Sequence, residues 1–69
     1  IGFSLIEPGF ARLYIVDLLG RKVAILAERY FDKGKHEIFF DASNLSSGRY
    51  YYVLQSAAGT LVRSMDVLK

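Results

Sequence analysis

With 69 residues and no cysteine, the chain forms one domain at most, and packing must stabilise it without disulfides or thiolate metal sites. Hydrophobic residues make up 52% of the sequence, which excludes intrinsic disorder, and no apolar run approaches the ~20 residues of a membrane-spanning helix. Nine basic residues against seven acidic ones give a net charge of +2, and only Arg21 and Lys22 are adjacent, so a clustered nucleic-acid footprint is missing.

Alternating apolar residues predict β-strands separated by glycine-containing turns. Six strands are expected, at residues 3–6, 10–18, 21–30, 35–41, 49–56 and 60–68. The segment over 23–31 also contains fair helix formers such as Ala24 and Leu26, so a helix competes there. Two glycine turns bound that segment and it lacks an N-cap, which favours a strand.

The strands recur about every 8–12 residues, which is typical of an antiparallel sandwich or barrel. We therefore expect an all-β fold: a small antiparallel β-sandwich of about six to seven strands, with one face of each strand turned inward. The residues predicted to face inward are Leu13, Ile15, Val23, Leu26, His36, Ile38, Phe40, Tyr50, Tyr52, Leu54, Met65 and Val67.

No pattern in the chain predicts catalysis, a cofactor or a metal. His36 is the only histidine and has no cysteine beside it, so we interpret it as an inward residue with a hydrogen-bonded ring. Asp41 and Asn44 lack the spaced oxygen ligands of a calcium loop and are better explained as turn caps. The serines have no nucleophile-elbow context, and the sequon at 44–46 is a three-residue pattern of low specificity.

Aromatic side chains on the predicted outer faces form a candidate contact surface. Tyr14, Phe39 and Tyr51 fall on positions that a two-layer sandwich would normally expose to water. Two interpretations stay open at this point: a surface for a partner or a glycan, or cross-strand pairs that stabilise neighbouring strands.

Four segments, in order, resemble one family. Residues 15–26 (IVDLLGRKVAIL) resemble V-Y-D-L-L-G-R-x-V-A-x-L, and residues 34–41 (GKHEIFFD) resemble G-x-H-x-V-x-F/W-D. Residues 45–54 (LSSGRYYYVL) resemble L-x-S-G-x-Y-x-Y-x-L, and residues 64–69 (SMDVLK) resemble K-M-x-L-x-K. The pattern is that of the C-terminal sorting domains of type IX secretion cargo, which are related to the immunoglobulin-like domain of flagellar hook-capping proteins.

The resemblance implies an immunoglobulin-like sandwich that acts as a non-enzymatic sorting signal on a larger protein of Bacteroidetes-like bacteria. Its partners would be outer-membrane type IX components and the N-terminal cargo domains of the same chain, with no nucleic acid and no membrane insertion. The cargo would pass through the periplasm to the cell surface or medium. An exposed terminal strand is also compatible with weak self-association. Residues 1–69 would be a single sorting domain that lacks the family's first N-terminal segment, because the chain has no initiator Met and no Pro-Asn-Pro-Phe motif.

The resemblance also assigns residues. The strand recognised by the secretion machinery would carry Met65, Val67, Leu68 and Lys69. The residues expected to define the fold are Gly20, Gly34, Leu45, Ser47, Gly48, Tyr50 and Tyr52. The alternative function is an immunoglobulin-like structural or adhesive module of an extracellular protein: a spacer, a carbohydrate-binding domain or a hook-capping-like domain.

Overall fold

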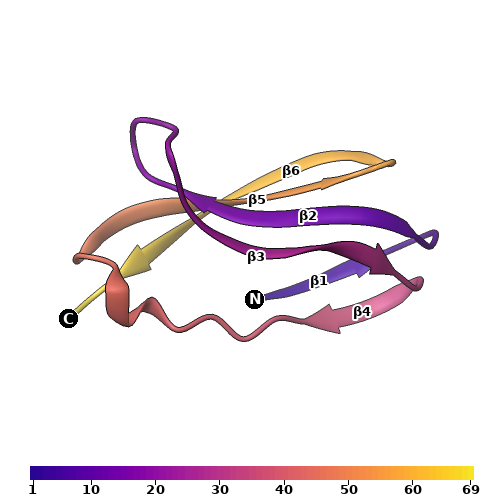
Figure 1. Cartoon of the computed structure of the whole chain (residues 1–69), viewed down its shortest axis with the longest axis horizontal. Helices are drawn as coiled ribbons and strands as arrows, with labels where there is room; N and C mark the ends of the chain where they lie inside the picture. The colour runs from indigo at the N-terminus through magenta and orange to yellow at the C-terminus, as the bar shows by residue number, and fades with distance from the viewer.

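A computed structural model describes all residues, 1–69, as two antiparallel β-sheets (Figure 1). The small sheet pairs β1 with β4, and the large sheet has the order β3-β2-β5-β6. The elements are β1 (Gly2–Leu5), β2 (Gly9–Val16), β3 (Lys22–Phe31), β4 (Gly34–Glu37), the 3₁₀ turn η1 (Ala42–Asn44), β5 (Gly48–Ser56) and β6 (Gly59–Val67). The all-β prediction and the six strands are confirmed, and the segment that could have been helical is a strand.

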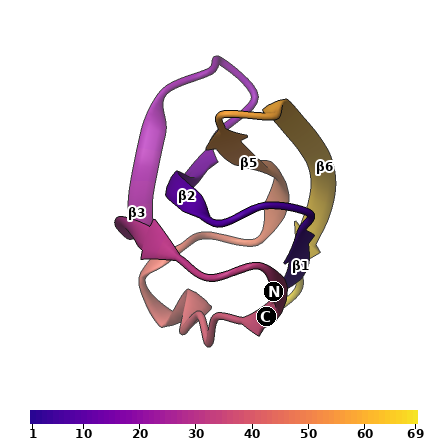
Figure 2. The ribbon, with the colours of Figure 1, turned by 90° about the vertical axis from the view of Figure 1, so that its right-hand side faces the viewer.

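The two sheets form two layers around a core (Figure 2). The β2 strand provides the centre of that core, because Ala11, Leu13 and Ile15 alternate along it and are completely buried. Leu13 lies opposite Leu54 of β5, and Phe3 of β1 packs onto the same cluster from the other sheet. This period-2 burial is what one inward face of a half-buried strand requires.

The predicted inward residues divide into three groups. Leu13, Ile15, Leu54 and Val67 are buried as expected. Partly buried positions are Leu26, His36, Ile38, Phe40, Tyr50, Tyr52 and Met65. Val23 is 39% exposed, so its prediction is wrong. The buried residues that the prediction omitted are Phe3, Ala11, Ala27, Phe31 and Val53.

Irregular pairing between β2 and β3 explains the error at Val23. The register shifts once between Leu13 and Tyr14 and once between Ile15 and Val16, so Leu26 and Val23 are extra residues without a partner in β2. An extra residue interrupts strict alternation and moves the following side chains to the other face. Ala27 consequently lies opposite Leu13 and is buried.

The fourth strand is shorter than predicted. It ends at Glu37 rather than at residue 41, because its partner β1 pairs only from Gly2 to Leu5. One further contact follows, between Ile38 and Ile1, and the chain then continues without a strand partner to η1.

Candidate recognition surface at the end of β6

The end of β6 is held to the turn that precedes β5. Within the sheet, Tyr50 lies opposite Met65 and Gly48 lies opposite Val67. Beyond the last paired residue, the Lys69 backbone N–H donates to Ser47 Oγ at 3.0 Å and its Nζ donates to the Ser43 carbonyl at 2.7 Å. The terminal residues therefore adopt a defined path across residues 43–47.

An ion pair joins β5 and β6 near the end of their pairing. Arg49 Nε donates to Asp66 Oδ1 at 3.0 Å, and both side chains are more than half exposed. This hydrogen bond and the nearby Asp66 charge raise the pKa of the Arg49 guanidinium above its usual value. Because the pair is exposed, it aligns β5 with β6 more than it stabilises the fold.

The four residues predicted for recognition differ in accessibility. Val67 is 6% exposed and belongs to the core, and Met65 is half-buried. Leu68 is 89% exposed, and Lys69 is exposed beside it. The structure thus brings all four together on one segment, but only Leu68 and Lys69 are exposed, and the Lys69 ammonium is bound to the Ser43 carbonyl.

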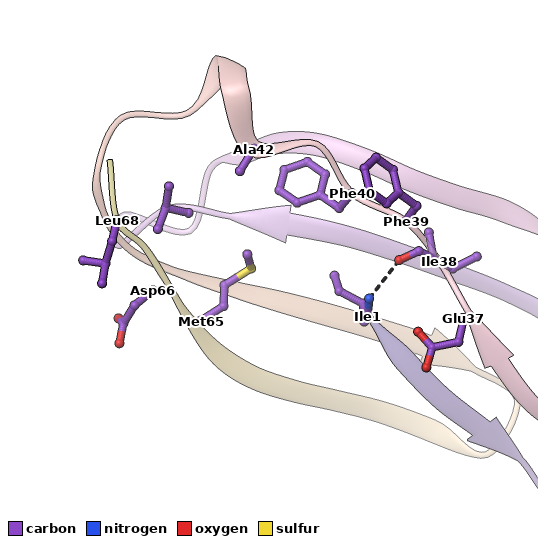
Figure 3. A pocket seen from close by; sticks show the side chains of 10 residues that line it. Ile1, Glu37, Ile38, Phe39, Phe40, Ala42, Met65, Asp66 and Leu68 are labelled. Carbon is purple, nitrogen blue, oxygen red and sulfur yellow. Dashed lines mark hydrogen bonds between the residues drawn. The ribbon is translucent and has the colours of Figure 1, made fainter.

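An apolar groove runs along this end of the molecule (Figure 3). We call it the terminal groove; its volume is about 660 Å³, and its lining residues are Ile1, Glu37, Ile38, Phe39, Phe40, Ala42, Met65, Asp66, Val67 and Leu68. Ile1 directly precedes β1, the next five residues lie between the end of β4 and the start of η1, and the last four lie at the end of β6 or just beyond it. The groove therefore lies between the two sheets, beside β6, which is an edge strand of the large sheet.

The sequence predictions did not assign this groove. Ile38 and Phe40 were expected inside the core, and Ile1 was given no role, yet all three line an open space. The apolar run at 38–40, directly after a short strand, is the signal in the sequence that could have indicated it.

Five of the residues expected to define the fold lie between η1 and β5 or in the first half of β5: Leu45, Ser47, Gly48, Tyr50 and Tyr52. Asp41 Oδ1 accepts a hydrogen bond from the Ser43 N–H at 2.9 Å, and the Leu45 N–H donates to the Ala42 carbonyl at 3.0 Å. The Tyr50 hydroxyl donates to the Ser46 carbonyl, four residues upstream, at 2.8 Å. This arrangement is similar to the tyrosine corner of β-sandwich domains, in which a tyrosine hydroxyl bonds the backbone a few residues earlier.

A second turn, between β2 and β3, is organised by Asp17. Its Oδ1 accepts from the N–H groups of Leu19 and Arg21, and its Oδ2 accepts from Arg21 Nε at 2.8 Å. These bonds, led by the one from the Arg21 N–H, hold the pKa of the Asp17 carboxyl below 3.8. Gly20 has a φ of +81°, a conformation that favours glycine, so this turn has a local requirement for it.

The three aromatic residues of the candidate contact surface do not form one patch. Tyr14 and Tyr51 lie on the outer face of the large sheet, where Tyr14 is opposite Val53 and Tyr51 is opposite Val16. Lys22 Nζ lies 4.6 Å from the centre of the Tyr14 ring. Phe39 instead follows β4, lines the terminal groove and is 90% exposed.

His36 has the structural role that the sequence predicted. Its ring centre lies 5.4 Å from that of Phe3 and 4.9 Å from that of Phe31, and its Nε2 is 2.7 Å from the Asp32 carbonyl oxygen. No group of three or more metal-ligating side chains gathers anywhere in the structure, and none of its helices has the length and apolarity to cross a membrane.

Comparison with known families assigns the chain. The family of secretion system C-terminal sorting domains matches residues 3–67. No curated protein and no solved structure matches the chain. The family match favours sorting over the structural or adhesive alternative, and sorting signals of this type direct a larger cargo through type IX secretion to the cell surface or medium. The chain belongs to the family of type IX secretion C-terminal sorting domains.

Proposed function

We propose that the secretion machinery reads this sorting signal at the end of β6, on the segment that carries Met65, Val67, Leu68 and Lys69. The proposal depends on one observation: β6 has a free edge, and the side chain of Leu68, directly after β6, is exposed. Leu68 is 89% exposed, and β6 is the last strand of the large sheet. Leu68 and Lys69 would make the direct contacts, while Met65 and Val67 would keep the strand seated on the core.

Strand addition is the recognition mode that this edge supports. The two-residue turn Ala57–Ala58 makes Ser56 and Gly59 a hydrogen-bonded pair, so alternate residues of β6 direct their N–H groups away from β5. By this register, Val62, Ser64 and Asp66 offer N–H groups at the free edge. An outer-membrane component could add an extended segment there and read the side chains beside it. The role is binding, and we propose no catalytic activity for the domain.

Export of the parent protein tests this proposal. Leu68→Asp should reduce the amount of cargo in the medium or on the surface at least about tenfold, because a buried contact with an aliphatic side chain would receive a charge. Ile6→Asp is the matched control: Ile6 is 88% exposed in the turn between β1 and β2, near the start of β6 and not its end. Both variants keep the core intact, which deletion of 65–69 would not, since Val67 is buried. Equal export of the two variants would contradict the proposal.

The same free edge supports weak self-association as a second candidate behaviour. Pairing of β6 with β6 of another copy would satisfy the N–H groups that β6 directs outward. Sedimentation velocity should then show a concentration-dependent dimer that Ser64→Pro abolishes, because proline removes an N–H from the edge but leaves the bonds to β5. A monomer at all concentrations would exclude this behaviour without affecting export.

A further inference from the structure

We infer that the polypeptide that precedes Ile1 runs as an extended strand through the terminal groove, where it continues the β1–β4 ladder alongside Phe39 and Phe40. The inference rests on the family assignment, because a C-terminal sorting domain is joined to its cargo on its N-terminal side. It does not depend on which residues the secretion machinery contacts.

The ladder between β1 and β4 is still in register at Ile1. The Ile1 nitrogen donates to the Ile38 carbonyl at 2.8 Å, and the Ile38 N–H donates to the Ile1 carbonyl at 2.8 Å. Two such reciprocal bonds define a hydrogen-bonded pair of an antiparallel ladder. A peptide N–H at Ile1 makes the same bond as the ammonium does here, so a preceding residue does not disturb this pair.

The direction of β1 leads an incoming chain through the groove. In Figure 3 the arrow of β1 points away from the groove, and Ile1 lies at its mouth with the bond to Ile38 drawn. Polypeptide that continues β1 backwards therefore passes between the segment with Phe39 and Phe40 and the end of β6 with Met65. This is the space whose volume is about 660 Å³.

Phe40 has the backbone groups that such a strand would bind. It is half-buried, yet neither its N–H nor its carbonyl takes part in any hydrogen bond. Unpaired backbone groups in an extended segment are available to pair with an added strand. Hydrogen-bonded pairs of an antiparallel ladder recur at every second residue, so the residue two positions before Ile1 falls opposite Phe40. The residue directly before Ile1 falls opposite Phe39, in a position without ladder bonds.

The apolar lining of the groove favours a covalently attached segment of the same chain over a separate partner. Eight of its ten lining residues are hydrophobic, and Phe39, beside the expected path of the incoming chain, is 90% exposed. A separate partner strand would have to bind from solution, whereas the incoming chain is already joined at Ile1. Its effective concentration at the groove is of order millimolar, which favours it over a free competitor.

Hydrogen exchange of the purified parent protein, read at single amides by mass spectrometry, tests the inference. The Phe40 amide should exchange at least about tenfold more slowly than in an unstructured peptide, since one net hydrogen bond corresponds to about that factor. Proline in place of the residue two positions before Ile1 removes the N–H that would donate to the Phe40 carbonyl. Because this weakens the reciprocal pair, the Phe40 amide should exchange faster than in the parent protein. Proline directly before Ile1 is the matched control, because the N–H that it removes faces away from Phe39.

The outcomes separate this inference from the proposed function. Slow exchange of the Leu13 amide, in the centre of the large sheet, shows that each variant is folded. Fast exchange at Phe40 in the parent protein, or identical exchange in the two proline variants, would overturn the inference. Protection that arises only when outer-membrane vesicles containing the secretion machinery are added would assign the groove to a partner strand and would also overturn it. None of these readouts depends on export.

Discussion

The side-chain ammonium of Lys69 donates to the backbone carbonyl of Ser43 at 2.7 Å, which ties the end of the terminal strand to the turn before β5. The contact joins residues that are 26 positions apart. It connects the segment proposed for recognition with the turn that the family resemblance assigns to the fold. The two roles are therefore physically linked at one place in the molecule.

Lys69→Met should loosen the end of β6 with little effect on overall stability. The bond is exposed, so its loss should change the free energy of unfolding by less than about 1 kcal/mol. NMR relaxation should nevertheless show faster motion of the Leu68 and Lys69 amides. Lys69→Arg, which keeps a donor at this position, is the control. Unchanged relaxation in Lys69→Met would mean that the backbone bond to Ser47 alone orders this end.

Leu13→Ala should destabilise the domain strongly. Leu13 is completely buried between the two sheets, and truncation of such leucines costs about 2–5 kcal/mol through lost burial and the cavity left behind. Leu18→Ala makes the same chemical change at a residue that is 67% exposed and should stay within about 0.5 kcal/mol. Urea unfolding of both variants provides the measurement, and equal midpoints would contradict the core described here.

Tyr50→Phe should reveal the contribution of the corner between η1 and β5. The change removes only the hydroxyl that donates to the Ser46 carbonyl, so we expect a loss of about 0.5–1.5 kcal/mol in the free energy of unfolding. Tyr30→Phe is the control, because Tyr30 is 62% exposed and its hydroxyl makes no hydrogen bond. Calorimetric melting temperatures that fall equally in both variants would show that the corner has no stabilising role.

Gly20→Ala should destabilise the domain, whereas Gly9→Ala should not. Gly20 has a φ of +81°, and an alanine in that region costs about 1–2 kcal/mol. Gly9 has no positive φ and open space around its Cα, so alanine there should be neutral or stabilising by up to about 1 kcal/mol through the unfolded state. Chemical denaturation distinguishes the two, and equal stability of the variants would show that the turn at Gly20 relaxes without strain.

Asp17 should make stability depend on acid pH. Its folded pKa lies below 3.8, so its contribution is complete above pH 3.8 and is lost as the pH falls through the folded pKa. Asp17→Asn should therefore lower stability at neutral pH and lose less stability than the unmodified chain on acidification. Asp32→Asn makes the same charge change at a side chain without hydrogen bonds. Urea midpoints with parallel pH profiles for Asp17→Asn and the unmodified chain would contradict the assigned role.

Local sequence patterns located the strands and turns, apart from the end of β4. Leu13 and Ile15 were correctly predicted to lie on the inward face of β2, and Gly20 and Gly34 marked turns where φ is indeed positive. These features depend on neighbours within a few residues, so periodicity and turn chemistry determine them. The ordered motifs also predicted the family, which the match over residues 3–67 confirms.

Pairing between strands decided what local patterns could not. The two register shifts between β2 and β3 leave Val23 exposed and Ala27 buried. An inserted residue moves the side chains that follow it in the strand to the opposite face of the sheet. Val53 is on the outer face but only 7% exposed, since Tyr14 and Val62 lie on either side of it in adjacent strands. The terminal groove likewise lies between the segment that follows β4 and the end of β6, which are distant in the sequence. Alternation along the chain determined which residues can face inward, and the alignment of strands distant in sequence decided which of them do.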